Sequence, residues 1–222
     1  MGEQIRLRAA DGIEFAAWRA DPAGPRRGGV VVVQEIFGVN AHIRSVCEGF
    51  ARNGFAAVAP ALFDRLRPGV ELGYDEAGVT EGRALVGDLG WDAPFLDIWA
   101  AAKALRADGQ VGVVGYCWGG SVAWLAGCRL DVACVSAYYG RHIVDFLGET
   151  PRCPAVLHFG AQDALIPLEN VEKVRAAHPD VPLYLYENAG HGFNCDQRPD
   201  FRADAAALAL RRTLDLFATH LR

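Results

Sequence analysis

The residues best suited to chemistry begin with a cysteine that follows an apolar run. Residues 111–120 read VGVVGYCWGG, so Cys117 lies in a Gly-x-Cys-x-Gly pattern between Gly115 and Gly119. This spacing is typical of a nucleophile elbow, a sharp strand-to-helix turn, with cysteine in place of serine. Such a turn crowds the residues two before and two after the nucleophile, and it sets the thiol at a helix N-terminus, which favours a thiolate. The pattern alone also fits a buried structural cysteine at a tight turn. The choice between the two interpretations therefore depends on whether the chain offers a base and an acid to partner Cys117.

Two further residues follow predicted strands in the order that a catalytic triad requires. The apolar runs at 155–160 and 184–187 are followed by Asp163 and His191, and folds with a nucleophile elbow have the chain order nucleophile, acid, histidine. His191 would hold the thiol proton and then donate it to the leaving group. Asp163 would fix the imidazole tautomer and stabilise the imidazolium. Taken alone, His191 could be an ordinary loop histidine, and Asp163 could be an aspartate of a turn or a helix cap. Three suitable residues at three successive strand ends nevertheless favour a triad.

Acyl transfer also needs N–H donors aimed at the developing oxyanion. One candidate is the backbone N–H of Trp118, directly after the nucleophile, and the other is that of Ile36, in the loop after the run at 29–34. Glu35 directly follows four valines, so its carboxylate should be partly buried, which costs free energy unless it has a partner. A salt bridge or a capping contact would account for Glu35, and a catalytic role is the alternative.

The histidines and cysteines outside these motifs are interpreted as structural. His158 lies within a predicted strand, where a hydrogen-bonded core histidine is the simpler interpretation. Four other histidines have no matching partner pattern and are interpreted as surface or structural: His42, His142, His178 and His220. No CxxC pair occurs among the six cysteines, which removes support for zinc-knuckle and thioredoxin-like sites. We therefore expect neither a metal nor a cofactor.

The elements that would position these residues alternate between short β-rich runs and longer helical stretches. Strands are predicted at residues 29–34, 54–59, 111–116, 132–138, 155–160 and 182–187. Helices are predicted near residues 40–52, 75–88, 94–107, 119–129, 168–178 and 201–221. Two alternating segments, 5–8 and 14–19, flank Asp11-Gly12, which is a hairpin signal and predicts antiparallel strands at the start of the sheet.

This alternation predicts an α/β fold with a mostly parallel central sheet and helices on both faces. In such sheets the site lies beyond the carboxyl ends of the strands, which is where the elbow, Asp163 and His191 would all lie. Together with the elbow, the pattern predicts the α/β-hydrolase fold, as a single domain over residues 1–222. The longest irregular stretch, residues 65–75, is expected to form part of a lid or pocket rim.

The composition of the chain limits the classes of partner that the protein is expected to bind. The net charge of −5 argues against nucleic-acid binding, which normally needs a basic face. No apolar run of 18 residues occurs, so no membrane span is expected, and the first residues lack the profile of a signal peptide. We expect a cytoplasmic protein, a monomer or small homo-oligomer, whose partner is a small-molecule ester or lactone.

Four stretches of the chain resemble the dienelactone hydrolase family (carboxymethylenebutenolidases). They are residues 34–40 (QEIFGVN), 54–60 (GFAAVAP), 115–120 (GYCWGG) and 190–193 (GHGF). The resemblance implies a triad of Cys117, Asp163 and His191, with Glu35 in contact with the resting thiol until substrate binds. It also implies a type reaction in which the lactone ring of a dienelactone is opened.

The chain departs from the family pattern in the residues that bind the substrate carboxylate. Dienelactone-specific members carry an arginine close after the histidine motif, whereas here none occurs before Arg198. On the helix after the irregular stretch, Arg83 is the candidate for a second anion-binding arginine, and no tyrosine follows it. Trp118 is bulkier than the aliphatic residue usual after the nucleophile. A general carboxylesterase or thioesterase, and a catalytically silent ligand-binding member of the fold, therefore remain as alternatives.

Overall fold

The computed structural model describes residues 2–221, which contain a central sheet of eight strands. The strands are β1 (Glu3–Arg8), β2 (Glu14–Ala20), β3 (Gly29–Val33), β4 (Ala56–Pro60), β5 (Val111–Tyr116), β6 (Cys134–Tyr138), β7 (Ala155–Gly160) and β8 (Leu183–Tyr186). Their order across the sheet is β1-β2-β4-β3-β5-β6-β7-β8. From β4 to β8 all neighbours are parallel, while β2 is antiparallel to both β1 and β4. The predicted antiparallel start and the mostly parallel sheet are confirmed.

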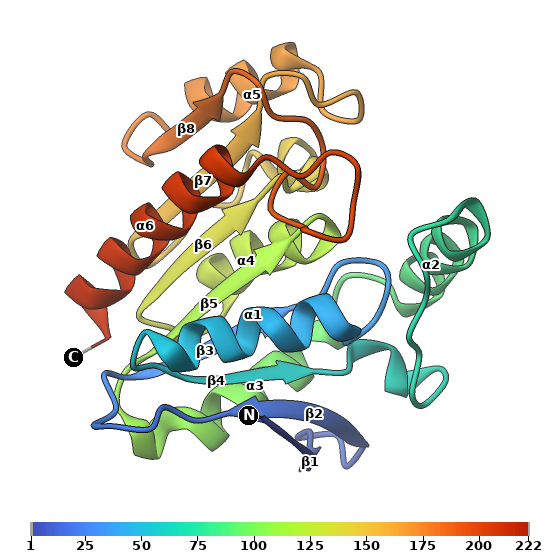
Figure 1. The fold of residues 1–222 in the computed structure, drawn as a ribbon, viewed down its shortest axis with the longest axis vertical. Coiled ribbons are helices and arrows are strands. Elements are labelled where there is room, and N and C mark those ends of the chain that lie inside the picture. Colours follow the sequence, from blue (N-terminus) through green and yellow to red (C-terminus); the bar gives the residue numbers. More distant parts are fainter. Residues whose placement is uncertain (1, 222) are drawn as a thin grey trace.

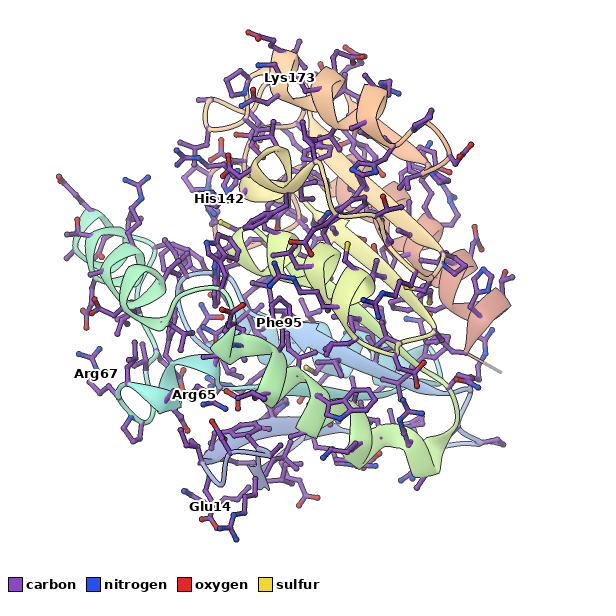
Figure 2. The ribbon with its side chains drawn as sticks, turned by 180° about the vertical axis from the view of Figure 1, so that it is seen from behind. Glu14, Arg65, Arg67, Phe95, His142 and Lys173 are labelled. Atoms are coloured by element: carbon purple, nitrogen blue, oxygen red, sulfur yellow. The ribbon has the colours of Figure 1, made fainter. Side chains whose placement is uncertain are left out.

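Helices cover both faces of this sheet, as predicted. They are α1 (Ala41–Arg52), α2 (Glu76–Leu89), α3 (Ala93–Leu105), α4 (Trp118–Arg129), α5 (Leu168–Ala177) and α6 (Ala203–His220), with short 3-10 turns η1 (Leu62–Arg65), η2 (Arg106–Asp108) and η3 (Arg141–Phe146). Helices α1 and α6 lie on one face (Figure 1), and α3, α4 and α5 lie on the other (Figure 2). Every predicted strand and helix is present, with ends shifted by at most two residues.

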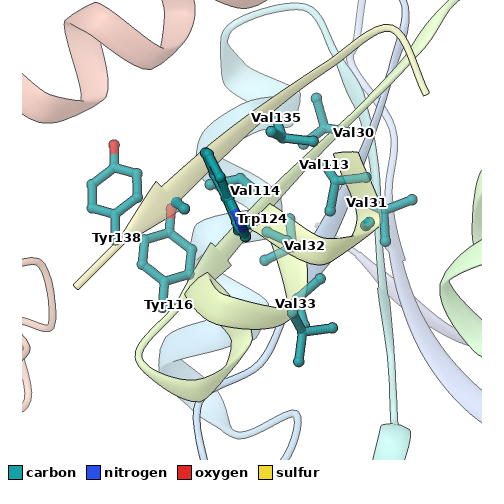
Figure 3. Packing of buried hydrophobic residues seen from close by; sticks show 14 of the residues in the cluster. Val30, Val31, Val32, Val33, Val113, Val114, Tyr116, Trp124, Val135 and Tyr138 are labelled. Atoms are coloured by element: carbon teal, nitrogen blue, oxygen red, sulfur yellow. The ribbon is translucent and has the colours of Figure 1, made fainter. Parts of the chain in front are cut away.

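The core lies where β3 and β5 run through the middle of the sheet. All five residues of β3 and all six of β5 are buried, because a parallel sheet with helices on both faces needs apolar side chains on both. Trp124 of α4 packs over the valines of these strands (Figure 3). Each fully buried valine contributes about 1.5–3 kcal/mol, so the strands that end at the functional site are among the most firmly held parts of the fold.

Helix α2 differs from the others because it stands away from the sheet, beyond the carboxyl ends of the strands (Figure 1). Its N-cap Asp75 accepts a hydrogen bond from the Gly78 N–H at 2.8 Å, which ends the irregular stretch where the helix was predicted to begin. Gly82 packs directly on the loop after β3, where an added Cβ would overlap the carbonyl group of Ile36. A glycine is therefore needed at this contact.

An ion-pair network centred on Arg65 connects η1 to α3 and to the β1–β2 turn. Arg65, at the end of η1 (Figure 2), binds both carboxylate oxygens of Asp97 in α3 at 2.8 Å and Asp11 of the β1–β2 turn at 2.7 Å. Because the side chain of Asp97 is fully buried, removal of Arg65 would leave an unpaired buried charge, which typically costs about 3–5 kcal/mol. Among residues 2–221, no helix is long and apolar enough to cross a membrane.

Candidate active site

Cys117 lies at the strand-to-helix turn between β5 and α4, in a strained backbone conformation. Its φ of 56° and ψ of −122° are rare for a residue with a side chain and cost about 1–3 kcal/mol. The flanking glycines permit the turn, since a Cβ at Gly115 would overlap the carbonyl group of Gly119, and one at Gly119 would overlap the Gln34 carbonyl oxygen. The Cys117 N–H donates to the Tyr138 carbonyl at 3.1 Å. The predicted crowding at this elbow is therefore present.

The structure brings the three predicted triad side chains together from three strand ends. His191 Nε2 lies 3.1 Å from Cys117 Sγ, and His191 Nδ1 lies 2.8 Å from Asp163 Oδ2. The other oxygen of Asp163 accepts the backbone N–H groups of Leu165 at 2.8 Å and Ile166 at 3.1 Å. Both Asp163 and His191 are buried. The carboxylate is thus fixed on its loop while it orients the imidazole towards the sulfur.

The electrostatics favour a charged imidazole. Burial lowers the pKa of His191, but the negative charge of the Cys117 thiolate, together with hydrogen bonds to Asp163 and Cys117, outweighs burial and raises this pKa to about 10. A histidine held between two anionic partners retains its proton at neutral pH. The arrangement therefore favours a protonated His191 beside the Cys117 sulfur, and a cysteine paired with an oriented histidine in this way is suited to nucleophilic chemistry.

The two residues predicted to supply the N–H groups of an oxyanion hole, Ile36 and Trp118, line the same cavity as Cys117. Trp118 begins α4, so its N–H is one of the first four of a helix, which have no intrahelical acceptor. Ile36 lies outside every helix and strand, and within the described chain its N–H finds no acceptor. Within residues 2–221 both N–H groups are therefore without a protein acceptor, and both belong to residues of the cavity that contains the thiol.

The thiol opens into a cavity of about 360 Å³. Its walls are mainly apolar, and they include Ile36, Phe37, Val79, Val86, Trp91, Trp118 and Leu165. The indole ring of Trp118 lies between Phe63, stacked at 5.8 Å between ring centroids, and Trp91 at 6.4 Å. Basic side chains line the same space: Arg83, Arg141, His142 and Arg198. Such a cavity suits a small molecule with an apolar body and a negative group.

Glu35 is buried beside this cavity, but its partner differs from the expected one. Its Oε1 accepts a hydrogen bond from Arg198 Nη1 at 3.4 Å, and no hydrogen bond joins Glu35 to Cys117 within residues 2–221. The expectation that Glu35 contacts the resting thiol is therefore wrong for this structure. The thiol pairs with His191, and Glu35 is the counterion of Arg198, which is consistent with the salt-bridge interpretation of a buried carboxylate.

Comparison with known proteins assigns the chain to a family. The family model of the dienelactone hydrolase family matches residues 15–221. The chain belongs to the dienelactone hydrolase family. The carboxymethylenebutenolidase of Pseudomonas putida is 34% identical over 226 residues, which cover 97% of this chain and 96% of that protein. The chain is thus a dienelactone hydrolase-type enzyme that acts on esters or lactones, and the catalytically silent alternative is set aside.

Solved structures agree with the family. A candidate dienelactone hydrolase from Klebsiella pneumoniae superposes with a TM-score of 0.85 at 28% identity, over 98% of this chain and all of that one. An esterase from Pyrococcus furiosus, at 16% identity, has a TM-score of 0.69 over the whole of this chain and 94% of its own. The second likeness concerns the fold alone, and it confirms the α/β-hydrolase fold for this dienelactone hydrolase family member.

Several predictions about the cavity of this dienelactone hydrolase family member need correction. None of the residues 65–75 lines the cavity, whose outer wall is α2 itself. His142 lines the cavity, which was not predicted, whereas the buried His42 agrees with the structural interpretation given for it. His158 is a core residue as predicted, since its Nδ1 bonds to the Tyr186 hydroxyl at 2.9 Å and burial lowers its pKa to about 3.

The two candidate anion-binding arginines lie in the same cavity. Arg83 is exposed on α2 and lines the cavity, and no carboxylate among residues 2–221 lies within ion-pair distance of it, which removes Glu76 and Asp88 as its partners. Arg198, which stood too far along the chain for the family pattern, is largely buried and reaches the cavity from the loop after His191. Its position depends on how that loop folds back towards β3, which no spacing rule in the sequence describes.

Proposed function

We propose that the chain hydrolyses a small, carboxylate-bearing ester or lactone through Cys117, His191 and Asp163, with an acyl-enzyme intermediate. The observation that supports this most directly is the 3.1 Å contact between the Cys117 sulfur and His191 Nε2 in a cavity lined by three arginines. A cysteine paired with an oriented histidine is an activated nucleophile. The arginines supply the positive charge that a carboxylate would need.

In the first half-reaction, the thiolate attacks the carbonyl carbon and the C=O electron pair moves onto oxygen. The N–H groups of Ile36 and Trp118 are the proposed donors to this oxyanion. When the tetrahedral intermediate collapses, the C–O bond to the leaving alkoxide breaks, and the imidazolium of His191 protonates the alkoxide. In a lactone the leaving alcohol stays attached to the acyl group, so the ring opens without loss of a fragment.

In the second half-reaction, neutral His191 accepts a proton from water as the water oxygen attacks the thioester carbonyl. The C–S bond then breaks, and the thiolate and imidazolium are restored together with a carboxylic acid, which ionises. Asp163 stabilises the imidazolium through both half-reactions and fixes the tautomer that leaves Nε2 facing the sulfur. This sequence needs no group beyond the residues of the chain and water.

Arg198 and Arg83 are proposed to bind the carboxylate of the substrate. At rest the charge of Arg198 is balanced by Glu35 across a long 3.4 Å contact, whereas Arg83 has no anionic partner among the described residues. A substrate carboxylate could bind Arg83 directly and compete with Glu35 for Arg198. Glu35 is then proposed to act on catalysis through Arg198, as the anion that is displaced when the substrate binds.

Removal of either arginine should affect anionic substrates selectively. A charged hydrogen bond contributes about 1.5–3 kcal/mol, so Arg83→Ala and Arg198→Ala should each lower kcat/KM for an anionic lactone about 10- to 150-fold. Hydrolysis of neutral p-nitrophenyl acetate should change little, because that ester has no carboxylate to bind. Steady-state kinetics on both substrates measure the difference. Equal losses on both would indicate damage to the fold or triad, and unchanged rates on both would favour a general carboxylesterase.

The value of kcat/KM should stay high as the pH rises far into the alkaline range. His191 must be protonated to supply the leaving-group proton, and its pKa is raised to about 10, so the protonated form is present below this pH and is lost above it. We expect the alkaline limb of kcat/KM near pH 10 rather than near 6.5, the value for free imidazole. Kinetics with the spontaneous hydrolysis subtracted would locate this limb.

Two measurements test whether Cys117 and His191 form a charged pair in the absence of substrate. Iodoacetamide should alkylate Cys117 rapidly at neutral pH without any ligand, since the pair already contains a thiolate. In Cys117→Ser, NMR titration should find a lower pKa for His191, because the thiolate charge that raises it is gone. Slow alkylation that a substrate-like anion accelerates would instead show that the thiol is protonated at rest and that substrate binding activates it.

A further inference from the structure

Three side chains that the proposed reaction does not require for bond making form a buried cluster behind the cavity. Glu35 follows β3, His42 lies in the first turn of α1, and Cys195 lies in the loop after His191. The carboxylate oxygen, imidazole nitrogen and sulfur that they offer all lie within 4.8 Å of one another. The exposed fractions of the three residues are 1%, 3% and 0%. Buried polar groups that gather in this way normally satisfy one another or a bound ligand.

Two atoms in this cluster are left unsatisfied. Neither Glu35 Oε2 nor His42 Nε2 has a hydrogen-bond partner among residues 2–221, although both belong to side chains that are more than nine-tenths buried. A buried polar atom without a partner costs about 1–3 kcal/mol. Glu35 uses only its Oε1 for Arg198, so its second oxygen remains available to a further partner.

We propose that Glu35, His42 and Cys195 bind a Zn²⁺ ion. A thiolate, an imidazole nitrogen and a carboxylate oxygen are the three ligand types that Zn²⁺ takes in proteins, and a thiolate is unsuited to Mg²⁺ or Ca²⁺. Zinc bonds of about 2.0–2.3 Å place tetrahedral ligand atoms roughly 3.3–3.8 Å apart. The cluster would therefore contract by about 1 Å, which rotation of the loosely paired Glu35 carboxylate could supply.

The surroundings of His42 match those of a metal ligand. Its Nδ1 lies 3.3 Å from Asp196 Oδ1, and metal-binding histidines typically donate their other ring N–H to a carboxylate in this way. With the proton on Nδ1, the buried Nε2, unpartnered among the described residues, carries the lone pair that a metal ion would bind. Because Asp196 directly follows Cys195, one loop supplies both a ligand and the residue that orients a second ligand.

The charges also agree with a dication. The thiolate of Cys195 would bring one negative charge to Zn²⁺, the Glu35 carboxylate would be shared between Zn²⁺ and Arg198, and the neutral imidazole completes three protein ligands. Arg198 contacts the opposite oxygen of Glu35, so the carboxylate could bridge the guanidinium and the metal. This site is separate from the triad, since none of its three ligands belongs to Cys117, His191 or Asp163.

Cobalt substitution tests the site with a readout that does not depend on hydrolysis. The experiment uses full-length Cys117→Ser, because the triad thiol and imidazole could themselves bind metal. Titration with Co²⁺ should give one ion per chain, with a thiolate-to-cobalt charge-transfer band in the near ultraviolet and the intense visible bands of tetrahedral Co²⁺. Added Zn²⁺ should displace the cobalt and remove both, and isothermal titration calorimetry would give the Zn²⁺ affinity.

Variants then assign the ligands. In the same background, Cys195→Ser should abolish the charge-transfer band, and His42→Asn and Glu35→Gln should each weaken Zn²⁺ binding. Asp196→Asn should weaken it by about 10- to 100-fold, as expected for a residue that orients a ligand. Cys153→Ser is the matched control, because Cys153 is half-buried outside the cluster and its removal should change nothing.

The possible results of these experiments either support or contradict the proposed Zn²⁺ site. Near-ultraviolet circular dichroism of each metal-free variant shows whether it has folded, and Cys195→Ser is nearly isosteric, so at least this variant keeps the test decisive. Absence of a stoichiometric cobalt complex in the folded Cys117→Ser protein would overturn the proposal. A charge-transfer band that survives in Cys195→Ser would do the same, because the sulfur ligand would then be a different cysteine. Neither result would bear on the proposed hydrolysis, since the protein used is already without its nucleophile.

Discussion

Replacement of Cys117 by alanine should lower kcat for any ester or lactone by about 10⁴-fold or more, because no acyl-enzyme can form without the sulfur. The fold should survive, since the elbow depends on the neighbouring glycines and alanine is smaller than cysteine. Kinetics on p-nitrophenyl acetate and on a lactone would measure the loss, and circular dichroism would confirm the fold. A rate within a few-fold of the parent enzyme would refute the assignment of the nucleophile.

The other five cysteines provide the control for this prediction. Each should tolerate conversion to serine with most of the activity retained: Cys47, Cys128, Cys134, Cys153 and Cys195. Burial raises the pKa of Cys153 to about 11 and that of Cys128 to about 12, so these two thiols stay protonated at neutral pH and are poor nucleophiles. A large loss from any one of them would show that the chemistry is shared.

Asp163→Asn should reduce kcat by about 10²- to 10⁴-fold on anionic and neutral substrates alike. The amide nitrogen cannot accept the proton on His191 Nδ1, so the imidazolium loses its partner and the neutral ring favours the tautomer with hydrogen on Nε2. The remaining amide oxygen can still accept the N–H groups of Leu165 and Ile166, which should keep the loop in place. Kinetics and the NMR pKa of His191 measure the effect.

The sign of the pKa change makes this prediction specific. The hydrogen bond from His191 to Asp163 helps to raise the pKa of His191, so this pKa should fall in Asp163→Asn and the alkaline limb of the rate profile should move down with it. Asp163→Ala would also remove the anchor of Leu165 and Ile166, and it should therefore lower the melting temperature more than the asparagine variant does. An unchanged pKa of His191 in Asp163→Asn would contradict the role given to the carboxylate.

Much of the fold could be predicted from the sequence because each element carries its own local pattern. The valines of β3 and β5 are apolar on both faces, which predicts buried parallel strands, and Asp163 and His191 follow two later strands at short distances. Parallel strands end at one edge of the sheet, so residues placed just after them converge there without any knowledge of side-chain contacts. This explains why the proximity of Cys117, Asp163 and His191 could be predicted.

What could not be predicted depends on contacts between segments far apart in the chain. Arg198 meets Glu35 across 163 positions, and the loop that carries it has no periodic pattern that would indicate its path. The proximity of His42 and Cys195 to Glu35 belongs to the same case, since ligand sets are recognised in sequences by short spacings and these residues have none. The length of the irregular stretch 65–75 predicts part of a lid or pocket rim, whereas it is the following helix, α2, that lines the cavity.

The way α2 is attached has a consequence for how substrate range can change. This helix supplies Val79, Arg83 and Val86 to the cavity, yet it contributes no triad residue and stands outside the two helical layers (Figure 1). Its close contact at Gly82 fixes its distance from the loop after β3, so side chains one turn away can be exchanged without moving Ile36. A library confined to the inner face of α2 should therefore change substrate preference while the proposed triad and most of the core remain constant.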